Sequence, residues 1–222
     1  MKQSDLETLW KFVRGDLTAP EFESWLYAHE GLENTLGSAL HLELIAANYQ
    51  NHEDVFNVQE TLRTSLRPPL KCECLLLPDL AVIPMGCDGL DKRFFATVQG
   101  IRSYGRNLWW LHLSHCKVCG QNWLIAQEER IYDDYMIKRL TEEEANQIVN
   151  TDKWPDDFLT YENVLKVGQT LSKACRFFDP MSYSLIDTVK DLRRERPGIK
   201  TPEMATLLGI TAEHVNELIK VS

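Results

Sequence analysis

The sequence lacks any long apolar run: no stretch reaches the roughly 18 residues that a membrane-spanning helix needs. Its first ten residues include Asp5 and Glu7 and contain no apolar segment, so we expect that they are not a signal peptide. Internal repeats and low-complexity segments are also absent. We therefore expect a cytoplasmic protein with no membrane partner, in a reducing compartment where structural disulfides are rare.

Motifs of the common enzyme classes are missing as well. The sequence contains no glycine-rich phosphate loop, no His-Glu-x-x-His, no Gly-x-Ser-x-Gly and no paired catalytic carboxylates. Its histidines are scattered, and His29, His41 and His52 lie on predicted helices, where we interpret them as surface or hydrogen-bonded residues. The sequence thus predicts a protein that is not an enzyme.

Basic residues are in the minority, with 24 Lys and Arg against 33 Asp and Glu, which gives a net charge of −9 and a pI of about 5.2. The content of hydrophobic residues, 44%, is that of an ordinary globular protein. An acidic surface repels nucleic acid and anionic membranes, whereas it suits a basic protein partner.

The hydrophobic pattern divides the chain into three segments. Residues 1–69 show helical periodicity and predict a bundle of four amphipathic helices that ends near Arg67-Pro68-Pro69. Two Ser/Thr-x-x-Glu patterns, at Ser4 and Thr18, predict capping boxes at the starts of the first two helices.

Residues 70–140 change to short runs of aromatic and aliphatic residues, which predict an antiparallel β segment. The strands are expected at Leu80–Ile83, Phe94–Val98, Leu108–Leu113 and Asn122–Gln127. Residues 141–222 are again helical, with a capping box at Thr141 and helices expected over 160–177 and 182–195. The predicted fold class is α+β and mainly helical.

Five of the six cysteines lie between residues 72 and 119. Cys116-Lys117-Val118-Cys119-Gly120 has the form of a metal-binding knuckle, because two thiolates two residues apart can reach one ion and the glycine allows the chain to turn. Cys72 and Cys74 supply a second pair. The sequence therefore predicts one structural Zn²⁺ ion held by Cys72, Cys74, Cys116 and Cys119.

Other uses of these cysteines stay open at this point. Cys87 could replace Cys72 or Cys74 as a ligand, whereas His115 is poorly placed to join the same knuckle. The cysteines could also be reduced core residues, as we interpret Cys175, or the knuckle could be a redox pair. Against a redox pair, no βαβ pattern surrounds Cys116.

The C-terminal residues 201–219 fit a helix-turn-helix. Thr201 is expected to cap the first helix and Pro202 to open it, Gly209 takes the turn and Thr211 caps the second helix. The second helix presents acidic residues where a DNA reader has donors, and the cluster of Arg193, Arg194 and Arg196 is interspersed with acidic residues like a solvated helix face. We therefore expect no nucleic-acid partner.

Two stretches carry a family resemblance. Residues 12–17 (FVRGDL), 21–27 (EFESWLY) and 40–45 (LHLELI) resemble the small helical module of immunity proteins from bacterial polymorphic toxin systems, such as contact-dependent growth inhibition. Residues 116–124 (CKVCGQNWL) with 128–133 (EERIYD) are similar to a zinc-ribbon half associated with the same systems.

The resemblance implies an immunity protein that binds and neutralises a cognate toxin domain, often a nuclease, without chemistry of its own. It does not fix the contact residues. We favour the acidic side chains beyond the knuckle over those of the N-terminal helices, because a zinc-stapled platform loses less entropy on binding. The favoured set is Glu128, Glu129, Asp133 and Asp134, and the other set is Glu21, Glu23, Glu30 and Glu33.

A zinc-containing helix-turn-helix regulator that binds DNA is the alternative function. The excess of acidic residues and the lack of basic residues in the second helix favour the immunity protein. The identity of the toxin and the oligomeric state are left open by the sequence.

Overall fold

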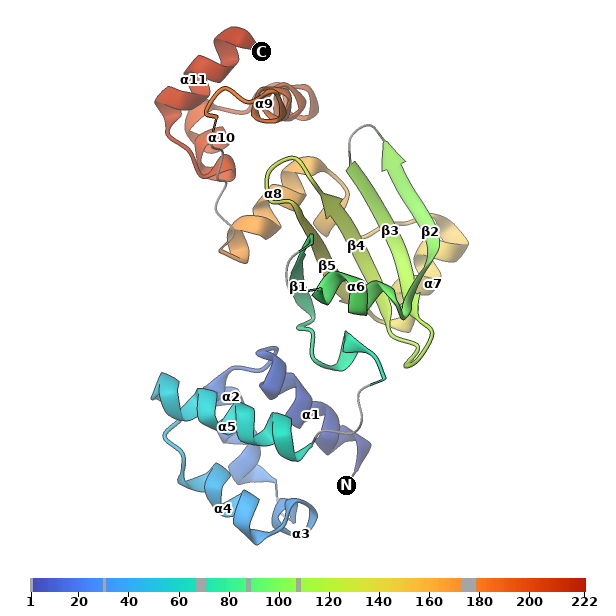
Figure 1. Cartoon of the computed structure of the whole chain (residues 1–222), viewed down its shortest axis with the longest axis vertical. Helices are drawn as coiled ribbons and strands as arrows, with labels where there is room; N and C mark the ends of the chain where they lie inside the picture. Colours follow the sequence, from blue (N-terminus) through green and yellow to red (C-terminus); the bar gives the residue numbers. More distant parts are fainter. Residues whose placement is uncertain (1, 30, 67–70, 87–88, 107–108, 173–178) are drawn as a thin grey trace. The chain divides into compact units, whose positions relative to one another are not determined.

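The computed structural model (Figure 1) describes residues 2–29, 31–66, 71–86, 89–106, 109–172 and 179–222. The chain forms two compact units, Met1–Asp79 and Leu80–Ser222. The first unit is helical, and the second contains a five-stranded antiparallel sheet together with further helices. The predicted α+β class is therefore confirmed.

The first unit contains five α-helices and one 3₁₀ helix within its described residues. They are α1 (Gln3–Arg14), α2 (Ala19–Ala28), α3 (Leu32–Leu36), α4 (Ser38–Ala46), α5 (His52–Ser65) and η1 (Glu73–Leu75). The rings of Phe12 and Phe22 stack at 3.8 Å between centroids in the centre of the core, and Tyr49 packs edge-on against Phe12. These aromatic contacts join α1, α2 and the loop before α5.

The capping boxes have different outcomes in this unit. Thr18 and Glu21 bond each other's backbone N–H groups at the start of α2, as predicted. The box expected at Ser4 is wrong, because α1 begins at Gln3 with Lys2 as its N-cap. The hydroxyl of Ser4 instead donates to the carboxylate of Asp5.

The sheet of the second unit has the strand order β1-β5-β4-β3-β2, and every neighbouring pair is antiparallel. Its strands are β1 (Leu80–Pro84), β2 (Val98–Arg106), β3 (Trp109–Cys116), β4 (Asn122–Glu128) and β5 (Asp134–Leu140). The strand predicted at Phe94–Val98 is wrong: Phe94 and Phe95 are the last residues of the short helix α6 (Leu90–Phe95), and β2 starts only at Val98. Strand β5 was not predicted.

The two faces of the sheet are covered by different helices, and side chains alternate between them along each strand. One face buries Leu111, Leu113, Leu124 and Ala126 against the helices that follow the sheet in sequence. The other face carries Trp123, which packs edge-on against Phe94 of α6 at 5.7 Å. Figure 1 shows α6 crossing the sheet face opposite α7.

The remaining helices pack against the sheet and against one another. They are α7 (Glu142–Thr151), η2 (Asp156–Phe158), α8 (Tyr161–Thr170), α9 (Tyr183–Glu195), α10 (Thr201–Leu208) and α11 (Ala212–Val221). A single core includes Leu124 of β4, Val164 of α8, Val189 of α9 and Val215 of α11. The sheet and the C-terminal helices therefore belong to one folding unit, because neither buries its apolar face alone.

The short turn between α10 and α11 has the expected residues. Gly209 adopts a left-handed conformation, with φ of 67°, and ends α10, while the Thr211 side chain caps α11. The cap expected at Thr201 is wrong, because Thr201 is the first residue of α10 and Lys200 is its N-cap, without a capping side-chain hydrogen bond. Among the helices that the structure describes, none is long and apolar enough to cross a membrane.

Candidate metal centre

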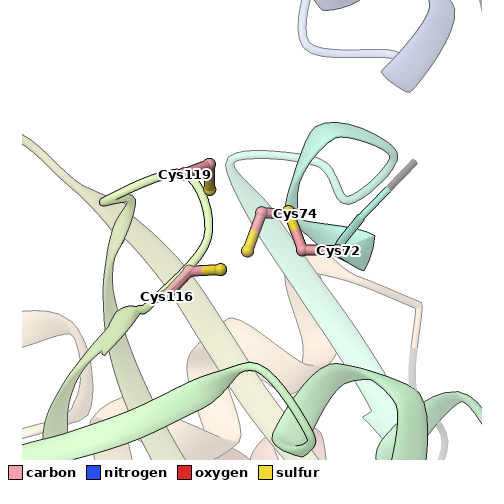
Figure 2. A group of neighbouring side chains, drawn as sticks. All are labelled: Cys72, Cys74, Cys116 and Cys119. Carbon is pink, nitrogen blue, oxygen red and sulfur yellow. The ribbon is translucent and has the colours of Figure 1, made fainter. Parts of the chain in front are cut away.

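Four cysteine side chains converge on one point (Figure 2). The sulfur atoms of Cys72, Cys74, Cys116 and Cys119 all lie within 4.8 Å of one another. Cys72 precedes η1 and Cys74 lies within it, whereas Cys116 is the last residue of β3 and Cys119 follows in the turn before β4. The sequence thus identified the four residues that the structure brings together.

The knuckle that carries Cys116 and Cys119 is fixed by backbone hydrogen bonds. The N–H of Cys116 donates to the carbonyl of Gln121, and the N–H of Gly120 donates back to the carbonyl of Cys116, each at 2.9 Å. Gly120 has φ of +76°, a conformation that L side chains rarely adopt, so the tight reversal requires glycine. The N–H of Lys117 donates to the carbonyl of Thr97, which ties the knuckle to the start of β2.

The surroundings of Cys116 favour the thiolate form. Burial by itself raises the pKa of this thiol, but the backbone N–H groups of Cys119 and Val118 and the hydroxyl of Thr97 lower it and outweigh that effect. The net result is a pKa lowered from 9.0 to about 7. A thiolate is the form that binds a metal ion.

The donor set fits a soft or borderline metal ion. In a tetrahedral zinc site with Zn–S bonds of about 2.3 Å, the sulfur atoms are about 3.8 Å apart. The spacing observed here, at most 4.8 Å, needs only a small contraction to reach that geometry. Cys74 and Cys116 are buried, Cys72 is partly buried and Cys119 is exposed. The arrangement supplies four protein ligands, which leaves no position for a substrate at a four-coordinate ion.

The alternatives for the ligand set have separate outcomes. His115 is not one of the residues that cluster in the described part of the chain, and its buried Nδ1 atom has no hydrogen-bond partner there. Cys87 and Cys175 lie outside the described residues, so their proposed roles stay predictions.

Thr97 is a contributor to the site that the sequence did not single out. Its hydroxyl donates a hydrogen bond to the carbonyl of Phe94 at 3.2 Å and helps to lower the pKa of the Cys116 thiol, and its carbonyl accepts the N–H of Lys117. Such outer groups orient the ligands and adjust the affinity of a site for its metal. Thr97 is brought to the knuckle because Val98 pairs with Cys116 across β2 and β3. Thr97 could have been identified only from that strand register, which the sequence did not predict.

Two of the four acidic residues favoured for toxin binding are buried. Glu128 has no exposed surface, and Asp134 is 3% exposed. The carboxylate of Glu128 accepts hydrogen bonds from the backbone N–H groups of Arg130, Ile131 and Tyr132. Glu128 therefore holds the loop after β4 in place, and the assignment of Glu128 and Asp134 to a contact surface is corrected.

The other acidic candidates remain on the surface or lie outside the described residues. Glu129 and Asp133 are exposed, as are Glu21 and Glu33 on the N-terminal helices. Glu23 is partly buried, and Glu30 is outside the described residues. Only two of the four acidic candidates after the knuckle are thus exposed to a partner. On the helical unit, most of the acidic candidates remain accessible.

Comparisons of this chain with protein-family models, with curated protein sequences and with solved structures found no match.

Proposed function

We propose that this chain is an immunity protein: a metal-stabilised binding protein that neutralises a cognate toxin domain by forming a tight one-to-one complex. The proposal rests on the resemblance of residues 12–45 and of the knuckle to proteins of toxin systems. It assigns the protein no catalytic step, so protection comes from covering the toxin.

We propose Zn²⁺ as the metal of the cysteine cluster, in a structural role. Four thiolates with no open position are the donor set of structural zinc sites. A zinc ion bound there contributes its binding free energy to folding. The ion would hold the knuckle and the η1 segment together. It would not contact the toxin or catalyse a reaction.

The observation that carries the proposed function is the separation of charge between the two units. Met1–Asp79 contains 13 acidic and 6 basic residues, whereas Leu80–Ser222 is nearly balanced, with 20 and 18. A nuclease toxin has a basic surface because it binds phosphate. An acidic helical unit would attract such a surface over a distance and select it by charge.

The alternative, a DNA-binding regulator, is supported by the short turn between α10 and α11 but opposed by the charges around it. Arg194 forms an ion pair with Asp191, and Arg196 pairs with Glu162 at 3.1 Å and with Glu203 at 2.5 Å. Two of the three arginines in the basic cluster are thus neutralised by their own chain.

The experiment that tests the function is rescue. The chain is produced in cells together with the toxin domain encoded by the neighbouring reading frame, and growth is compared with and without the chain. We expect growth only when the chain is present, and a stable complex when the two purified proteins are mixed. The absence of a toxin-like neighbour, or toxin action unaffected by the chain, would contradict the proposal.

A further inference from the structure

Helix α4 exposes an apolar stripe although its opposite side lies in the core. Leu44 is fully buried, whereas Ala39, Leu42 and Ala46 are exposed. These three residues are spaced at i, i+3 and i+7, so they line one side of the helix. Leu42 is 61% exposed, an unusual state for a leucine in the middle of a folded helix.

Tyr27, an exposed tyrosine on α2, reaches the C-terminal end of α4. The hydroxyl of Tyr27 donates a 3.2 Å hydrogen bond to the carbonyl of Ile45, yet 61% of Tyr27 is exposed. The hydroxyl of Tyr49 donates to the carbonyl of Leu44 nearby, and burial raises the pKa of Tyr49, with Tyr27 and Glu23 raising it further. The hydrogen bond to the carbonyl of Ile45 places Tyr27 beside the end of α4.

The part of the sequence that contains the stripe carries formal charge of a single sign. Residues 15–62 contain nine Asp and Glu and no Lys or Arg. Three histidines are the only side chains in this range that can become positively charged. Glu43 is exposed next to Leu42 in α4, and Glu33 is exposed in α3, whose last turn leads into α4 through the hydrogen bond from Gly37 to the Glu33 carbonyl. An apolar centre with a charged rim is the composition of a protein-binding surface.

We propose that this surface of the helical unit, formed by Tyr27, Leu42, Ala39 and Ala46 with Glu33 and Glu43 of α3 and α4, is the docking site for the basic toxin domain. The inference rests on the proposed function and names its contact surface. Leu42 and Tyr27 supply the apolar anchors, while the acidic rim speeds association and excludes acidic partners. The absence of any Lys or Arg over residues 15–62 is what selects a basic occupant.

The test measures association and dissociation rates of the full chain, loaded with zinc, with the purified toxin domain encoded beside its gene. Leu42→Ser is expected to weaken binding about tenfold or more, mainly through faster dissociation. The double variant Glu33→Lys/Glu43→Lys is expected to slow association about tenfold at low salt, with the difference shrinking as salt rises.

Matched controls separate the surface from general effects. Phe56→Ser removes a side chain that is 60% exposed on α5, and Glu213→Lys/Glu217→Lys makes the same charge change on exposed positions of α11. Both controls are expected to bind like the wild type, and melting curves confirm that every variant is folded.

The outcomes distinguish the two proposals. Wild-type binding that is unchanged by Leu42→Ser and by Glu33→Lys/Glu43→Lys overturns the docking site and leaves the function standing. Equal weakening by the α4 variants and by the controls also overturns the site. Failure of the wild-type chain to bind the domain removes the function, and the docking site with it.

Discussion

The hydroxyl of Tyr161 donates a 2.7 Å hydrogen bond to the carboxylate of Glu128, and both groups are buried. Tyr161 begins α8 and Glu128 ends β4, so the bond joins the sheet to the helices behind it. Arg130 lies over the ring of Tyr161, 4.6 Å from its centre, and forms an ion pair with Asp191 of α9. A charged side chain that sequence alone assigns to the surface is thus the centre of a buried network.

Replacing Glu128 is expected to destabilise the second unit strongly. In Glu128→Gln the amide group turns a donor toward N–H and O–H groups that need an acceptor, so buried hydrogen bonds to a charged group are lost. We expect the free energy of unfolding to fall by about 3 kcal/mol. Denaturant unfolding measures this, with Glu129→Gln, at an exposed position, as the control that should change stability by less than about 0.5 kcal/mol.

Replacing Gly168 by alanine tests the packing of α8, because whether stability rises or falls distinguishes an open position from a close contact. An exposed helical glycine changed to alanine commonly gains up to about 1 kcal/mol. A Cβ atom at Gly168 would lie 2.7 Å from the ring of Tyr132, so Gly168→Ala is expected to lower stability by about 1–3 kcal/mol instead. The double variant Gly168→Ala/Tyr132→Leu should lose less than the sum of its parts, and strict additivity would contradict the close approach.

We expect about one zinc ion per chain after purification without chelators. Cys116→Ser/Cys119→Ser removes two ligands and should release the metal and lower the melting temperature, because bound structural zinc contributes to folding. Elemental analysis and thermal unfolding measure both effects. Protein that contains no metal, or a double variant that melts like the wild type, would contradict the assignment.

The Thr97→Val variant tests the threonine beside Cys116. It keeps the shape of the side chain but removes the hydroxyl, which donates to the carbonyl of Phe94 and lowers the pKa of the Cys116 thiol, so we expect metal affinity to fall about tenfold or more. Competition with a coloured chelator gives the affinity. Thr170→Val, which alters an exposed hydroxyl that bonds only its own helix, is the control and should leave metal affinity unchanged.

No sequence-selective binding to duplex DNA is expected at physiological salt. The exposed residues of α11 include Glu213 and Glu217, and Arg194 and Arg196 at the end of α9 are paired within the chain. These charges repel phosphate groups. A gel-shift assay with random and genomic duplexes tests this expectation, and a selective shift that survives rising salt would favour the regulator.

Local signals in the sequence predicted the parts of the fold that depend on neighbouring residues. The capping boxes at Thr18 and Thr141 are present because each needs only four consecutive residues. Strand β5 was missed because Lys138 and Arg139 interrupt its apolar run. They are tolerated because Lys138 reaches Asp157 and Arg139 lies over the ring of Trp123, and such partners are set by tertiary structure.

The candidate site shows the same division. Two close pairs of cysteines are a local signal, and all four residues meet in the structure. The burial of Glu128 and Asp134 had no such signal, because Glu128-Glu129 and Asp133-Asp134 look alike in sequence. Which carboxylate of each pair faces inward follows from the pairing of Glu128 with Asp134 across β4 and β5, which places both on one side of the sheet.

The position of Cys116 at the end of β3 also constrains how this protein can change in evolution. Side chains alternate along a strand, so one inserted residue in β3 that shifts its pairing would turn Cys116 to the opposite side of the sheet, away from Cys119 and the η1 cysteines. An insertion of two residues would preserve the side. Insertions and deletions in related sequences should therefore lie in loops, or involve two residues at a time within β3. The cysteine site and the register of β3 should then be kept or lost together.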